Sequence, residues 1–133
     1  DALPTYRASL DDADSEKYPF IMVSGSRLPN ALHSRLHDVP WLRSLRPEPM
    51  ADINFDDAKA MNISYLDTIN ISSPLGTITV KANPSYLVKR GTIHMYHGYR
   101  EADINSLISS EHNDPYSGFP GYRSFRCRID KEA

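Results

Sequence analysis

The stretch Pro19-Phe-Ile-Met-Val-Ser-Gly-Ser-Arg-Leu-Pro-Asn-Ala-Leu-His-Ser34 passes from an apolar segment straight into a loop of small polar residues. Residues 20–23 are apolar and follow a proline, a pattern typical of a buried strand. Residues 24–26 (Ser-Gly-Ser) carry little bulk, so backbone N–H groups there can approach a ligand closely. Arg27 adds a guanidinium beside them. This grouping suits phosphate or a flat, hydrogen-bonding heterocycle.

The residues after this loop predict a short helix followed by an irregular segment. The run 30–37 has helix-forming character, and Asn30 is a suitable N-cap that would direct the positive end of the helix at the loop. Residues 39–45 contain the only tryptophan, Trp41, which we expect to be a packing anchor. Three prolines favour an ordered loop without regular helix here: Pro40, Pro47 and Pro49.

The remaining chain alternates strand-like runs with tight turns. Asn54 is a suitable N-cap for a helix with Phe55, Ala58 and Met61 on one side, and Asn62 fits the residue that follows its end. Runs 68–72 and 77–82 flank a Ser-Pro-Leu-Gly turn and predict a hairpin. We expect further strands at 50–53, 86–88, 92–96 and 124–129. Such a sequence predicts a mainly β fold with short helices, arranged as a small closed barrel.

Length, net charge and hydropathy limit the classes of function that this chain can have. The chain of 133 residues fits one domain, which we place at 18–133, with 1–17 as a linker or N-terminal arm. A net charge of −2 gives no support for a nucleic-acid surface. No apolar run approaches the ~20 residues that span a bilayer, so direct membrane insertion is not expected.

The single cysteine, Cys127, excludes an internal disulfide and any multi-cysteine metal site within this chain. It lies in the alternating run 124–129, on the same face as Phe125 and Ile129. We therefore expect a buried core residue, and the alternative of a reactive thiol between Arg126 and Arg128 would need an exposed side chain.

Several motifs, in this order and spacing, carry a family resemblance. They are Ser24-Gly-Ser-Arg27 with His33-Ser34, the run 39–49 (Val-Pro-Trp-Leu-Arg-Ser-Leu-Arg-Pro-Glu-Pro), the run 51–63, the run 71–82, and Asp114-Pro-Tyr-Ser-Gly-Phe-Pro-Gly-Tyr-Arg123. Over roughly residues 18–130 the chain resembles the C-terminal domain of the dimethyl sulfoxide reductase family. The resemblance implies a six-stranded double-psi β-barrel.

The resemblance also implies a cofactor and a larger parent protein. The cofactor would be molybdopterin guanine dinucleotide with molybdenum or tungsten, and an iron–sulfur cluster would belong to the parent only. The parent would be an oxidoreductase, whereas this fragment alone would be inactive. The implied partners are other domains of the parent catalytic subunit and an electron-transfer subunit. The substrate is not readable, and cytoplasm and periplasm of a prokaryote both stay open.

The resemblance implies a set of cofactor-binding residues but no catalytic residue and no metal ligand. Arg27 would balance the charge of anionic cofactor atoms, and the serines would donate hydrogen bonds to the cofactor. Asn105 would form hydrogen bonds with an amide edge of its ring. Gly118, Pro120 and Gly121 would direct the end of the last loop toward the same site. Many relatives carry a basic residue where Ser26 stands. The full set is Ser24, Gly25, Ser26, Arg27, His33, Ser34, His97, Gly98, Asn105, Tyr122 and Arg123.

Three other interpretations stay open at the level of sequence. His33 and His37 would share a helix face and could chelate a metal, although an HExxH motif is absent; without a metal, we expect His37 to be exposed. The Gly25-Ser26 bond resembles the self-cleavage site of aspartate decarboxylase, which shares the double-psi fold. A barrel that acts as a stand-alone binding module, without a cofactor, is the third.

Overall fold

A computed structural model describes residues 14–111 and 113–132, and six strands form its framework. The strands close into a barrel in the order β1-β5-β2-β4-β3-β6. A closed order leaves none of these six strands with an unpaired edge. Their bounds are β1 (Phe20–Val23), β2 (Met50–Asn54), β3 (Thr68–Ser72), β4 (Thr77–Ser85), β5 (Thr92–Met95) and β6 (Phe125–Lys131).

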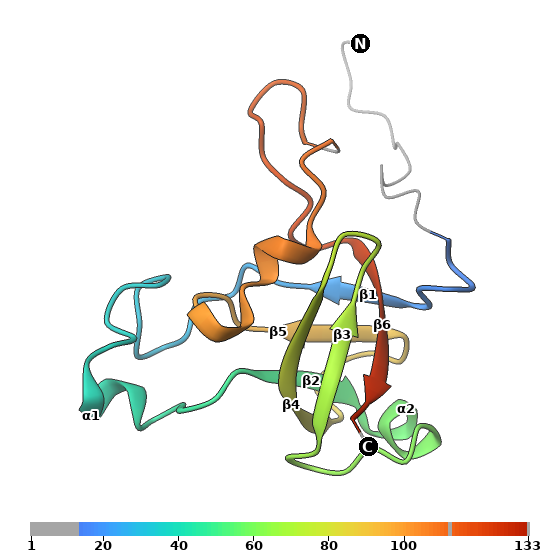
Figure 1. The fold of residues 1–133 in the computed structure, drawn as a ribbon, viewed down its shortest axis with the longest axis horizontal. Helices are drawn as coiled ribbons and strands as arrows, with labels where there is room; N and C mark the ends of the chain where they lie inside the picture. Colours follow the sequence, from blue (N-terminus) through green and yellow to red (C-terminus); the bar gives the residue numbers. More distant parts are fainter. Residues whose placement is uncertain (1–13, 112, 133) are drawn as a thin grey trace.

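Two parallel pairs define the topology. Strand β1 runs parallel to β5, and β2 runs parallel to β4, whereas the other four pairings are antiparallel. In Figure 1 the strands β1 and β5 cross the direction of β3, β4 and β6. The structure thus confirms the expected mainly β, six-stranded double-psi barrel. The hairpin of β3 and β4 pairs Ser72 with Thr77, as the turn between them predicts.

The barrel interior is filled by alternate residues of the strands. Along β6, Phe125, Cys127 and Ile129 are buried and the residues between them are more exposed, because side chains alternate between the faces of a strand. Cys127 has no exposed surface, which confirms the prediction of a core cysteine. The largest apolar side chains with almost no exposure are Met22, Ile53, Ile69, Ile71, Ile93, Met95, Ile104 and Leu107.

The helix α2 (Phe55–Ala60) begins and ends as the sequence predicts. The Asn54 side chain accepts a hydrogen bond from the backbone N–H of Asp56 at 3.0 Å, which satisfies an otherwise free helix N–H. Asn62 follows the C-cap with φ +54°, a conformation that asparagine adopts more readily than most residues. Ala58 faces the core, but Phe55 is exposed and stacks on Tyr86 instead.

The segment between β1 and β2 corrects two predictions. Residues 30–37 form turns rather than a helix, because His33 and Leu36 have φ values of +56° and +73°, which a right-handed helix cannot contain. The Asn30 side chain does not cap a helix there and donates to the Leu42 carbonyl.

The prolines were also misjudged. A short helix, α1 (Pro40–Arg43), occupies the segment predicted to lack one, since a proline in the first turn lacks only an N–H that has no helical partner. Trp41 on this helix is 72% exposed, so the prediction of a packing anchor is wrong. Residues 86–88 form a turn rather than a strand.

Two long connections extend from the barrel. The strap, defined as residues 30–47, carries α1 and lies at the end of the view opposite α2 in Figure 1. Between β5 and β6 come two 3₁₀ turns, η1 (Arg100–Ala102) and η2 (Ile104–Leu107), and then the loop 109–123. Most of the predicted arm 1–17 falls outside the described residues. Among the helices that the structure describes, none is long and apolar enough to cross a membrane.

Candidate functional site

A cleft of about 1170 Å³ opens between the strap and the segments that leave β1 and β5. This volume is somewhat larger than the range of roughly 300–1,000 Å³ found for small-molecule sites. The lining residues come from four segments that are distant in sequence: Gly25; His33, Ser34, His37, Asp38, Pro40 and Arg43; His97, Gly98, Tyr99, Arg100, Glu101, Asp103 and Asn105; and Phe119, Tyr122 and Arg123.

Most of the residues expected from sequence to bind a cofactor meet at this cleft. They are Gly25, His33, Ser34, His97, Gly98, Asn105, Tyr122 and Arg123. Three others do not line it. Ser24 is buried under the loop, whereas Ser26 and Arg27 are exposed beside it. The charged and aromatic lining from α1 and η1 was missed, although the cluster Tyr99-Arg-Glu101 directly follows the end of β5.

One end of the cleft is built where the loop after β1 meets the loop before β6. The backbone N–H of Ser24 donates to the Tyr122 carbonyl at 2.8 Å. A side chain at Gly25, which has φ +91°, would contact both Tyr122 and Arg123 at 3.8 Å. Contacts at this distance are ordinary, so it is the positive φ rather than lack of space that favours glycine at this position.

The floor of the cleft contains a pair of histidines. His33 Nδ1 and His97 Nε2 lie 2.8 Å apart, so one nitrogen carries the shared proton and the other accepts it. Burial lowers the pKa of His97, and the positive charges of His33, Arg27 and His37 lower it further, whereas a hydrogen bond to the Ser26 backbone raises it. Arg27 thus acts on the site electrostatically even though it does not line the cleft.

Gly98 is where the strap touches the barrel. With φ +109°, its position leaves no room for a side chain, because a Cβ atom would lie 2.4 Å from the His33 carbonyl oxygen and 2.9 Å from His37 Nε2. A separation below 3.0 Å would force the strap to move. Gly98 is therefore required for the close contact that holds the wall of the cleft in place.

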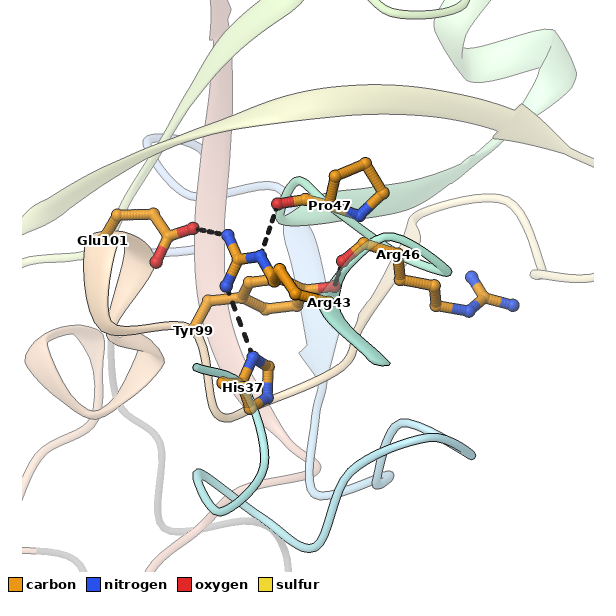
Figure 2. A network of polar contacts seen from close by, with 6 residues as sticks. All are labelled: His37, Arg43, Arg46, Pro47, Tyr99 and Glu101. Carbon is orange, nitrogen blue, oxygen red and sulfur yellow. Dashed lines mark hydrogen bonds and ion pairs between the residues drawn. The ribbon is translucent and has the colours of Figure 1, made fainter. Parts of the chain in front are cut away.

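Arg43 anchors the strap through four contacts, shown in Figure 2. Its Nε donates to the Pro47 carbonyl at 2.7 Å, one terminal nitrogen forms an ion pair with Glu101, and the other lies 3.4 Å from His37 Nδ1. The guanidinium also stacks on the Tyr99 ring at 5.0 Å. The planar, five-donor guanidinium suits these simultaneous roles, which a lysine could not fill.

The pKa values of Tyr99 and Glu101, which belong to this cluster, are both shifted. Burial raises the pKa of Tyr99 against the opposing charges of Arg43 and Arg46, and its hydroxyl donates to the Arg46 carbonyl at 3.2 Å. Burial alone would raise the pKa of Glu101, but a backbone hydrogen bond and the Arg43 guanidinium outweigh it and hold that pKa below its ordinary value. A carboxylate and a guanidinium thus stay charged at the cleft wall.

Comparison with known proteins identifies this architecture. The model of the molydopterin dinucleotide binding domain family matches residues 20–126, from the first residue of β1 into β6. The chain belongs to this family. The resemblance noted from the sequence motifs is thereby confirmed.

Individual relatives support the same assignment. A dopamine dehydroxylase from Eggerthella lenta is 30% identical over 97% of this chain, and the F420-dependent formate dehydrogenase subunit alpha of Methanocaldococcus jannaschii is 31% identical over 77%. This chain spans only 14% and 15% of those proteins. The structure of acetylene hydratase from Pelobacter acetylenicus shares the fold, with a TM-score of 0.89 at 21% identity over 98% of this chain and 21% of that chain.

The residues of the cleft fit the anionic, heteroaromatic ligand of a molydopterin dinucleotide binding domain. Three arginines line it (Arg43, Arg100 and Arg123), and arginine binds phosphate groups in a bidentate manner. Buried polar atoms of Ser24, His37 and His97 have no hydrogen-bond partner among the described residues. Such atoms are costly when unpaired, so they favour a polar ligand.

The residues that the structure describes do not fit a metal held by this chain. No group of three or more His, Cys, Asp or Glu side chains within the described ranges is arranged to hold a metal ion. His33 and His37 do not share a helix face, since the strap has no helix there, and His33 bonds to His97 instead. The chelating pair considered from sequence is therefore absent. His37 is also buried, whereas the sequence suggested an exposed residue.

Proposed function

We propose that this chain forms one wall of a molybdopterin guanine dinucleotide site in a larger molybdenum or tungsten oxidoreductase. The observation that carries the proposal is the cleft, where segments far apart in sequence bring arginine, histidine, amide and backbone groups together. The cofactor supplies the redox chemistry when bound, and this chain binds and orients it. An iron–sulfur cluster and an electron-transfer subunit would belong to the remainder of the enzyme.

The two ends of the cleft suit different tasks. At the Gly25 end, Arg123 and close-approaching backbone favour phosphate oxygens. The rest of the lining contains both donors and acceptors: the Arg43 guanidinium can donate, whereas the Glu101 and Asp103 carboxylates can accept. A ring that presents both N–H and carbonyl groups needs this mixture. We assign cofactor-binding roles also to Ser34, Asn105 and Tyr122, which line the same cleft.

The proposal is tested by cofactor retention in the intact catalytic subunit. Arg123→Ala should lower the pterin and metal content of the purified protein, because a hydrogen bond to a charged group contributes about 1.5–3 kcal/mol. Pterin is measured by fluorescence after oxidation, and metal by mass spectrometry. The matched control is Arg128→Ala, since Arg128 is also exposed but pairs with Asp130 on β6, outside the cleft lining.

Arg27→Ala belongs in the same series, since the family resemblance gives Arg27 a cofactor-binding role although it does not line the cleft. We expect it also to lower pterin content, through its charge. Equal pterin content in wild type, Arg123→Ala and Arg128→Ala would overturn the proposed site. A loss confined to Arg123→Ala would retain the site and remove Arg27 from it.

A further inference from the structure

The short helix α1 turns its apolar side chains away from the barrel. Its Arg43 points to the barrel side, where it contacts Glu101 and the Tyr99 ring (Figure 2). Trp41 and Leu45 lie two positions before and after Arg43, so they are on the opposite side of the helical turn. They are 72% and 66% exposed, and no residue of α1 is buried. A surface helix of a globular protein normally has the reverse arrangement, with its apolar side toward the core.

The rest of the strap has the same division between polar and apolar side chains. Leu32 and Leu36, which precede α1, are exposed as well. We call these two leucines, together with Trp41 and Leu45, the outer residues of the strap. None of the four belongs to the cleft lining, to which the strap contributes polar residues that include His37. The strap therefore uses its polar side for the cleft and leaves its large apolar side chains exposed.

The area of the outer residues indicates what kind of partner can cover them. One tryptophan and three leucines expose only on the order of 500 Å², which is less than the roughly 800 Å² per partner that a stable complex of separate proteins buries. A partner in the same polypeptide needs less area, because the covalent link gives it a high effective concentration. The size of this surface thus favours another domain of one chain over a second copy or a separate protein.

We propose that the outer residues of the strap, with Trp41 at their centre, dock against an apolar pocket on another domain of the same catalytic subunit. This inference rests on the proposed function, because it needs the larger enzyme in which this chain forms one wall of the cofactor site. Continuity with the cleft supports this partner. The strap is a wall of that cleft, so a domain that covers the open side of the cleft comes against the strap as well.

The residue types around the helix fit an interface between domains. Tryptophan is enriched among the few residues that dominate binding energy, and these residues lie in apolar pockets of the partner. Exposed charges of both signs surround it on the strap: Arg35, Asp38 and Glu48. An apolar centre with a polar rim is the usual arrangement of an interface. Docking would hold the strap from outside, whereas the contacts of Arg43 hold it from the barrel side.

The first measurement compares the exposure of Trp41 in two samples, the 133-residue chain and the intact catalytic subunit without other subunits. Trp41 is the only tryptophan of this chain, and its oxidation by hydroxyl radicals can be followed by mass spectrometry of the peptide that contains it. Oxidation should be about tenfold or more slower in the intact subunit, because the centre of an interface is shielded from water. Equal rates in the two samples would overturn the inference.

The decisive variant is Trp41→Asp. Aspartate suits the first turn of a helix, and Trp41 is largely exposed, so the 133-residue chain should keep its wild-type urea midpoint. In the intact subunit the variant should uncover the strap, and trypsin should cleave after Arg35 about tenfold faster than in wild type. In the 133-residue chain, where nothing covers the strap, trypsin should cleave variant and wild type at equal rates.

Tyr65→Asp is the matched control. Tyr65 is an aromatic residue with 63% exposure, in the turn between α2 and β3 and away from the strap. This variant should leave the cleavage rate after Arg35 unchanged in both samples. Equal acceleration by Trp41→Asp and Tyr65→Asp would overturn the inference, and so would no acceleration by either. If the Trp41→Asp subunit is not obtained, Trp41→Ser is measured by the same criterion.

The remaining outcomes identify other partners or separate the two proposals. A dimer of the 133-residue chain that Trp41→Asp dissociates would overturn the inference in favour of a second copy, and light scattering detects it. A loss of stability of Trp41→Asp in the 133-residue chain would overturn it too, since Trp41 would then pack within this domain. Pterin present with Trp41 unprotected refutes only the docking, whereas Trp41 protected without pterin refutes only the proposed function.

Discussion

At the scale of single residues, Gly98 gives the sharpest link between backbone geometry and the site. Gly98→Ala should reduce the free energy of unfolding by more than Gly91→Ala. Both glycines have positive φ, which costs an alanine about 1–2 kcal/mol. Only Gly98 would also bring a Cβ to 2.4 Å from the His33 carbonyl, whereas nothing lies within 4 Å at Gly91.

Urea unfolding of both variants measures the difference, and the fluorescence of the exposed Trp41 on the strap reports whether the strap has shifted. Equal losses of stability would mean that the strap moves away from residue 98 at no cost. The close contact would then be irrelevant to the stability of the cleft wall.

Single residues also show what sequence could and could not reveal about the site. Gly25 stood out from the residues alone because it lies in a small-residue loop after a predicted strand, whereas His97 and Arg123 were singled out only by the family resemblance. Arg43 and Glu101 were missed, since neither belongs to such a motif and their contact joins positions 58 residues apart. His37 was judged exposed, because the burial that it gains from Tyr99 and Gly98 depends on tertiary contacts.

At the scale of elements, a polar cluster ties three strands together on the barrel surface. The Asp52 carboxylate of β2 bonds to His94 of β5 at 2.8 Å and accepts from Asn83 of β4 at 2.6 Å. Burial would raise the pKa of Asp52, but these hydrogen bonds and the charges of His94 and Arg46 lower it overall. The charged form is therefore more stable in the folded state than in the unfolded chain.

This cluster predicts a specific acid dependence. Because the folded pKa of Asp52 lies below its ordinary value of 3.8, the stabilisation is fully present above that pH and is lost as the pH falls through the folded pKa. Asp52→Asn should therefore be less stable than wild type at neutral pH, and the difference should narrow in acid. Denaturant unfolding at a series of pH values measures it.

Asn83→Ala is the control, since it keeps the titrating carboxylate and should retain a loss of stability on acidification. A constant difference between Asp52→Asn and wild type at every pH would show that Asp52 acts only through packing.

Helices and strands were predictable where a local sequence signal is enough to specify them. Alternation located β3, β4 and β6, an apolar run after a proline located β1, and the Asn54 cap located α2, because these signals lie within a few residues. The strap was not predictable in the same way. His33 has a positive φ where it contacts Gly98 and His97, which are distant in sequence, so no local signal at 30–37 opposed the helix propensity.

At the scale of the whole molecule, the closed barrel should shield its cysteine. Cys127 has no exposed surface and sits in β6 between β1 and β3. A thiol reagent should therefore react only when these strands separate, so the labelling rate should follow global unfolding in denaturant. Ser124→Cys, which places a thiol at an exposed position just before β6, is the control and should label at once.

Rapid labelling of Cys127 in folded protein, at a rate close to that of the Ser124→Cys thiol, would contradict the prediction. It would show that β6 leaves the barrel by local opening without loss of the remaining structure.

The hydrophobic pattern of the sequence contributed least to predicting how the strands are ordered in the barrel. Periodicity indicated a small closed barrel, but the parallel pairing of β1 with β5 and of β2 with β4 joins strands that no turn connects. The family resemblance supplied the double-psi arrangement. This is expected physically, because hydrophobic alternation specifies which face of a strand is buried and not which strand lies beside it.

The pairing of the first strand with the last has a consequence for biosynthesis. Strand β1 pairs with β6 on one side, so the first strand of this barrel to be synthesised waits for roughly a hundred further residues before its second neighbour exists. Until β6 is synthesised, two strand edges of the unfinished barrel have no hydrogen-bonded neighbour. Such edges can pair with strands of other chains. We therefore expect translation that stops before Phe125 to yield a product that chaperones retain or proteases remove.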